Sequence, residues 1–78
     1  MLNSAEWSFF KRAIMRYLDR FKKIQAGNMI ALITFLHEDD RRFIGCRWID
    51  IVNALNDLIK SSDVRMGYED GNIVFYVK

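Results

Sequence analysis

Residues 63–77 read DVRMGYEDGNIVFYV, and apolar side chains alternate there with others on both sides of Asp70-Gly71. This spacing is typical of β-strands. An Asp-Gly pair also tolerates the positive φ angles of a tight hairpin turn. The stretch therefore predicts a β-hairpin with strands at about 63–68 and 72–77. A two-stranded hairpin is only marginally stable alone, so we expect other elements to cover it.

The chain begins with an apolar stripe of helical spacing, in which residues recur at steps of three and four from Trp7 to Ile24. Asn3 and Glu6 stand at the separation of a capping box. These features predict a first helix at about 4–23. Beyond it the helical pattern breaks, and residues 24–26 are expected to form a short third strand.

Two further helices are predicted between this strand and the hairpin. The second, at about 28–38, is apolar nearly all round and has Asn28 as its expected N-cap. The third, at about 47–60, again carries apolar residues at steps of three and four. Between them Phe43 and Ile44 are expected to fill the core.

The order of these elements defines the fold class, which is α+β. Helix, short strand, helix, turn, helix and hairpin follow one another as in a winged helix, or winged helix-turn-helix. The second and third helices form the helix-turn-helix, and the hairpin forms the wing. With 78 residues, no linker and no repeat, residues 1–78 are expected to be a single domain.

Composition excludes several classes of protein. The longest apolar run, residues 29–36, is too short to cross a bilayer, and residues 1–7 lack the pattern of a signal peptide. Cys46 is the only cysteine, so an internal disulfide is excluded. We therefore expect no membrane contact and an intracellular, reducing compartment.

No site for catalysis is predicted. The chain lacks a phosphate-binding loop, and His37 and Cys46 are each the only residue of their type. Glu38, Asp39 and Asp40 are contiguous rather than spaced as calcium ligands, and four zinc ligands are not available. The sequence therefore indicates a protein that is not an enzyme, with no cofactor, no metal and no small-molecule substrate.

Acidic residues on the third helix and at the hairpin tip argue against a strong grip on DNA. Asp50 and Asp57 are expected to point outward, where they would face phosphates, and Glu69 and Asp70 lie at the tip. Asn53 and Asn56, on the same helix, have the chemistry to read adenine edges. The candidate partner-binding residues are Met66, Tyr68, Tyr76, Asn53 and Asn56, because aromatic and methionine side chains mark protein interfaces.

Basic residues concentrate at the front of the chain. Residues 1–27 hold six basic and two acidic side chains, whereas residues 28–78 hold six basic and eight acidic ones. One group is expected on one side of the first helix and another around the turn before the third helix. The most common role of such groups is a solvated face, and the alternative is weak, non-specific contact with nucleic acid or an acidic partner. The candidate nucleic-acid residues are Arg12, Arg16, Arg20, Lys23, Arg41, Arg42 and Arg47.

Three segments resemble one family. FKRAIMRYLDRF (10–21), IVNALNDLIKSSDVRM (51–66) and DGNIVFYV (70–77) resemble the first helix, the third helix with its following strand, and the last strand of the C-terminal winged-helix domain of minichromosome maintenance (MCM) replicative helicases. Subunit three is the most similar. The hairpin is about two residues longer than the family pattern, and Trp48 is not part of it.

This resemblance implies a non-catalytic domain of a longer, nuclear helicase subunit whose ATPase lies outside this chain. Its partners would be the origin recognition complex and the loading proteins. The alternative from the residues themselves is a small dimeric winged-helix regulator of viral, plasmid or prokaryotic origin, which is cytoplasmic, pairs through its first helix and binds DNA.

Overall fold

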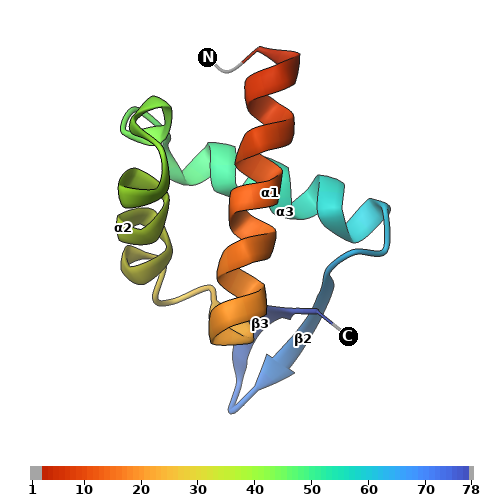
Figure 1. Cartoon of the computed structure of the whole chain (residues 1–78). Coiled ribbons are helices and arrows are strands. Elements are labelled where there is room, and N and C mark those ends of the chain that lie inside the picture. The colour runs from red at the N-terminus through yellow and green to blue at the C-terminus, as the bar shows by residue number, and fades with distance from the viewer. Residues whose placement is uncertain (1–2, 78) are drawn as a thin grey trace.

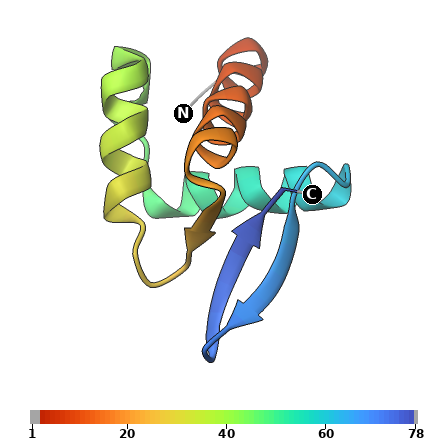
Figure 2. The ribbon, with the colours of Figure 1, turned by 60° about the horizontal axis from the view of Figure 1, so that its bottom comes forward.

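The structure, a computed structural model, describes residues 3–77 as three helices and a three-stranded antiparallel sheet (Figure 1). The order is α1 (Ser4–Phe21), β1 (Lys23–Gln25), α2 (Ile30–Asp39), a 3₁₀ turn η1 (Arg41–Phe43), α3 (Trp48–Lys60), β2 (Arg65–Glu69) and β3 (Asn72–Tyr76). Figure 2 shows α1 and α2 side by side above α3, with the hairpin of β2 and β3 projecting on the other side. The α+β class is confirmed, and the layout is compatible with that of a winged helix.

The predicted capping box opens α1. The Glu6 N–H donates to Asn3 Oδ1 at 2.9 Å, and the Asn3 N–H donates to Glu6 Oε1 at 3.2 Å. The helix ends at Phe21, two residues before the predicted end. Lys22 adopts a φ of +76°, and its N–H bonds the Leu18 carbonyl at 2.8 Å. A positive φ breaks the helical path, so the next residue enters β1.

The strand β1 and the start of α2 differ from the prediction by one or two residues. The third strand exists, but it spans Lys23–Gln25 rather than 24–26. Asn28 was wrongly predicted as an N-cap: α2 begins at Ile30, after Met29, with no side-chain cap bond. Met29 is buried, so packing rather than capping chemistry sets this helix start.

The connection from α2 to α3 is a capped turn. The Asp40 carboxylate accepts the Arg42 N–H at 2.9 Å and opens η1. Phe43 is buried as predicted, whereas Ile44 is 59% exposed and does not fill the core. The short η1 turn directs only one of these two adjacent side chains inward.

The sheet has the strand order β1-β3-β2, with both pairs antiparallel. The hairpin strands, Arg65–Glu69 and Asn72–Tyr76, are shorter than the predicted 63–68 and 72–77. The turn lies at Asp70-Gly71, where both residues have positive φ, as predicted from the Asp-Gly pair. Ile24 pairs with Phe75, so β1 covers one edge of the hairpin.

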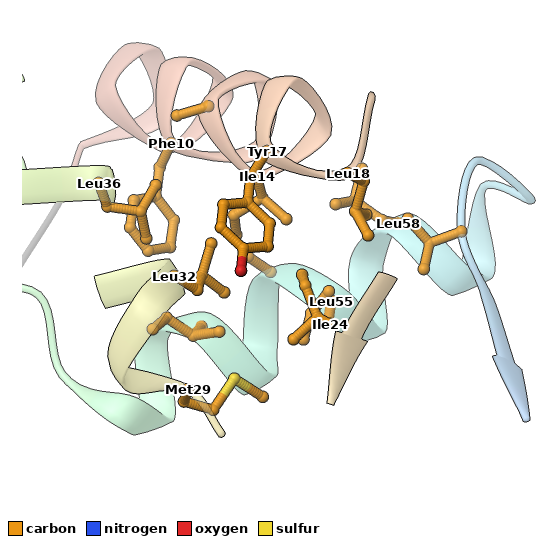
Figure 3. Packing of buried hydrophobic residues seen from close by; sticks show 14 of the residues in the cluster. Phe10, Ile14, Tyr17, Leu18, Ile24, Met29, Leu32, Leu36, Leu55 and Leu58 are labelled. Atoms are coloured by element: carbon orange, nitrogen blue, oxygen red, sulfur yellow. The ribbon is translucent and has the colours of Figure 1, made fainter. Parts of the chain in front are cut away.

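The core lies where all three helices meet β1 (Figure 3). Its largest fully buried side chains come from every helix, from η1, from β1 and from the segment after α3: Phe10, Ile14, Leu18, Ile24, Leu32, Leu36, Phe43, Ile51, Leu55 and Val64. Phe75 on the central strand β3 and Val77 just after it are both partly buried against the same cluster. No helix in residues 3–77 has the length and hydropathy needed to cross a bilayer.

Candidate interaction surfaces

The outward face of α3 carries both apolar and polar side chains, and no carboxylate lies at its centre. At about 100° per residue, Ile49, Asn53, Asn56 and Lys60 lie along one line, opposite the buried stripe of the helix. All four are exposed. Trp48, which precedes Ile49 and points about 100° away from it on the flank opposite Asp50 and Asp57, is 49% exposed, and Ile49 is 48% exposed. We call these five residues the α3 face.

The two aspartates of α3 do not point outward as predicted. The Asp50 carboxylate accepts the Arg47 N–H at 2.8 Å and caps the start of the helix. Asp57 is half-buried, and its Oδ2 accepts a 2.9 Å hydrogen bond from Trp7 Nε1 on α1. Both carboxylates therefore lie on the flank of α3 and leave the α3 face without negative charge.

The three hairpin residues predicted to bind a partner do not form one patch. Paired residues of a sheet share a face and successive residues alternate, so Met66 and Tyr68 lie on the face that includes Phe75, toward the core. Tyr76 lies on the opposite face, with its ring 3.3 Å from the position that a Cβ on Gly67 would occupy. Met66 and Tyr68 are 53% and 74% exposed.

On the opposite face of the sheet, an ion pair connects the two outer strands. Lys23 Nζ on β1 bonds Glu69 Oε1 on β2, across the strand between them. Val74, on the same face of β3, is buried although it lies outside the main core. Lys23 was predicted to belong to the basic side of the first helix, but it lies in β1 and neutralises one of the two acidic residues of the hairpin tip.

Several candidate nucleic-acid residues are already paired within the chain. Arg16 on α1 bonds Asp39 on α2 at 2.5 Å, and Arg42 bonds Asp40 through both carboxylate oxygens. These hydrogen bonds from Arg42 hold the pKa of Asp40 below its ordinary value. Partial neutralisation reduces the field that these two arginines present to a polyanion.

Phe9 lies between Arg12 and Arg42 in a small surface cluster. The guanidinium of Arg12 lies 5.9 Å from the Phe9 ring centroid, and that of Arg42 lies 5.0 Å from it. The fold thus brings α1 and η1 together at one exposed ring. The guanidinium of Arg20 lies 5.1 Å from the Phe21 ring centroid, further along α1, so the three arginines on this side of the helix each have a different partner.

The remaining predicted residues are dispersed. Arg41 and Arg47 are exposed at the two ends of the connection before α3. Ile49 and Phe9 are exposed residues that were not among the predicted sites. A helical wheel of α3 would have found Ile49, since the wheel places it opposite the buried stripe.

His37 and Cys46 are both partly buried. His37 Nε2 is buried without a hydrogen-bond partner among the described residues. Cys46, two residues before α3, is partly buried and packs against the core. Within residues 3–77, no three His, Cys, Asp or Glu side chains lie close enough together to hold a metal ion.

The thiol of Cys46 is expected to react slowly. Burial, assisted by the nearby Asp50 charge, raises its pKa, so less thiolate is present at neutral pH. Reaction with a chromogenic disulfide reagent at pH 8 should be slower for the folded protein than for the same protein in denaturant. An equal or faster rate in the folded state would contradict this environment.

Comparison of the chain with protein-family models, with curated proteins and with solved structures gives no match.

Proposed function

We propose that this chain is a non-catalytic winged-helix module that binds a partner protein through the α3 face. The observation that carries the proposal is the exposure of two large apolar side chains, Trp48 and Ile49, at consecutive positions in the first turn of α3. Protein interfaces are typically anchored by large apolar side chains that are surrounded by polar ones. Asn53 and Asn56 supply adaptable hydrogen bonds beside them.

The winged-helix assignment is part of the same proposal. It is supported by the strand order β1-β3-β2, by the placement of β1 between α1 and α2, and by the turn that joins α2 to α3. In this fold the third helix and the hairpin are the elements most exposed for recognition.

The MCM resemblance suggests which partners to test first. If it holds, the module belongs to the DNA replication machinery of the nucleus and docks on the origin recognition complex and the loading proteins. The order of the elements, which is compatible with a winged helix, supports this choice, and the exposed Trp48 and Ile49 of the α3 face suit protein contact better than phosphate contact.

DNA binding is the second candidate, and the positions of Asp50 and Asp57 favour it more than the sequence did. With both carboxylates on the flank, Asn53, Asn56 and Lys60 are free to approach a groove. The Lys23–Glu69 pair also leaves Asp70 as the one acidic residue of the hairpin tip that is outside the described ion pairs. The basic residues of α3 and its N-cap are Lys60 and Arg47, at opposite ends of the helix, and base reading usually needs positioning contacts to phosphates beside the groove.

A titration separates the two candidates. Backbone amide NMR spectra would be recorded with duplex DNA at low and physiological salt, and with purified origin recognition and loading proteins. We expect shifts at residues 48–56 with the proteins and negligible shifts with DNA at physiological salt. Strong DNA shifts at the same residues, with an affinity that falls steeply with salt, would replace the first proposal by the second.

The charge substitution Ile49→Glu tests the α3 face directly. Interface anchors contribute about 2 kcal/mol or more, which corresponds to roughly a thirtyfold loss of affinity. Phe9→Glu is the matched control, because Phe9 is also exposed but lies on α1. Equal losses in the two variants would show that binding does not use the α3 face.

A further inference from the structure

The strand β2 is an open edge of the sheet. It lies last in the order β1-β3-β2, and four of its five residues, Arg65–Glu69, are exposed. In Figure 2 this strand runs along the side of the hairpin away from β1. An edge strand with free backbone groups is a template for pairing with another strand.

The register identifies which backbone groups face outward. The Ala26 N–H donates to the Ile73 carbonyl at 2.9 Å, so the backbone groups of Ile73 point away from β2. Along a strand, the N–H and C=O groups of successive residues point to opposite sides in turn. Val74 therefore turns these groups toward β2, where it pairs with Gly67, so the odd-numbered residues of β2 bond to β3. Met66 and Tyr68 therefore turn their N–H and C=O groups to the open edge.

The chemistry of β2 is complementary to itself. Its order is base, apolar, glycine, apolar and acid. In an antiparallel pair of identical strands centred on Gly67, Arg65 stands opposite Glu69 of the second copy, and Met66 stands opposite Tyr68 of the second copy. Every side chain thus meets one of complementary chemistry, which a shift of one residue would lose.

We propose that a second copy of this chain adds to β2 in this register and forms a two-fold symmetric dimer with a continuous six-stranded sheet. The outward backbone groups of Met66 and Tyr68 then bond those of Tyr68 and Met66 in the other copy. A contact with closed two-fold symmetry uses the same patch twice, as β2 does here.

The surroundings of β2 suit this occupant. An open hollow at its start is lined by the apolar side chains of Ile59, Val64 and Met66 and by the polar residues Ser62, Arg65 and Tyr76. Tyr68 of the second copy, opposite Met66, faces this hollow and covers apolar surface there. On the other face, the Glu69 carboxylate has two oxygens, so it accepts from Arg65 of the second copy while keeping Lys23.

The dimer is independent of the proposed function. Trp48 begins α3 and Lys60 ends it, about 18 Å apart along the helix axis, and β2 follows the far end. Pairing through β2 leaves the first turn of α3 open. A strand-addition interface of five residues is small. The dissociation constant of the dimer should therefore lie in the micromolar to millimolar range.

Sedimentation equilibrium with charge-reversed variants tests the pairing. The unsubstituted chain should become dimeric as its concentration rises. Arg65→Glu alone places acid opposite acid, and Glu69→Arg alone places base opposite base, so each variant should stay monomeric. An equimolar mixture of the two variants restores both ion pairs and should sediment as a heterodimer. Circular dichroism would verify that each variant is folded.

Arg12→Glu is the control, since it makes the same charge change on α1, the helix through which the regulator alternative would dimerise. It should leave the dimer intact. The proposal is overturned if the chain stays monomeric at millimolar concentration, if neither β2 variant weakens a dimer, or if the mixture fails to associate. Loss of the dimer in Arg12→Glu alone would assign it to α1 instead.

Discussion

Phe10→Ala is expected to remove most of the stability of the domain, whereas Phe9→Ala should leave it folded. Phe10 is fully buried, stacks on Trp7 at 5.7 Å between ring centroids and meets Phe43 edge-on at 5.2 Å. Truncation of a buried phenylalanine to alanine costs about 3–5 kcal/mol. A domain of 78 residues has a free energy of unfolding of about 4–12 kcal/mol, so this loss is severe.

The adjacent residue provides the matched control. Phe9 is 42% exposed, and its ring contacts are with the guanidinium groups of Arg12 and Arg42. Exposed contacts of this kind contribute about 0.5–1 kcal/mol each. Urea denaturation followed by circular dichroism would measure both variants. Because neighbouring residues are about 100° apart on a helix, equal losses would mean that α1 is rotated relative to the structure described.

The sequence predicted the interiors of the elements better than their ends. The spacing of apolar residues predicted α1, α3 and the hairpin correctly. A buried stripe recurs about every 3.6 residues in a helix and every two residues in a strand, so the two are distinguishable in the sequence. The ends depend on single backbone angles and on tertiary packing. Lys22 adopts a positive φ that lysine rarely shows, and Met29 starts α2 because it is buried, so neither boundary has a signal in the local sequence.

The sequence predicted most of the residues of the candidate surfaces but not how these residues are arranged. Asp57 lies fifty residues from Trp7 in the chain, and their hydrogen bond depends on how α1 crosses α3. Sequence patterns do not contain that crossing. The same holds for Arg42 and Phe9, which meet only because η1 folds against α1. Alternation within the hairpin, by contrast, already implied that Tyr76 and Tyr68 lie on opposite faces once the Asp-Gly turn had fixed the register.

Ile24→Ala is expected to have the second large effect, because this side chain ties the sheet to the helices. Ile24 is 1% exposed, lies in the three-residue strand β1 and pairs with Phe75 on β3. Deleting most of a buried isoleucine costs about 2–5 kcal/mol. Since a hairpin is marginal without a third strand or a helix to pack against, the loss should appear in β3 as well as in β1.

Gln25→Ala is the control, since Gln25 lies in the same strand with an exposed side chain on the other face. Such a surface change should alter the free energy of unfolding by about 0.5 kcal/mol or less. Amide hydrogen exchange gives the second readout: in Ile24→Ala the amides of Ile73 and Phe75, which face β1, should lose protection before those of α3. Unchanged protection there, together with a small loss of stability, would mean that the hairpin is held to the helices by Phe75 and Val77 alone. Retained protection in the control and its loss in Ile24→Ala would establish that a strand of three residues is what makes the terminal hairpin part of the domain.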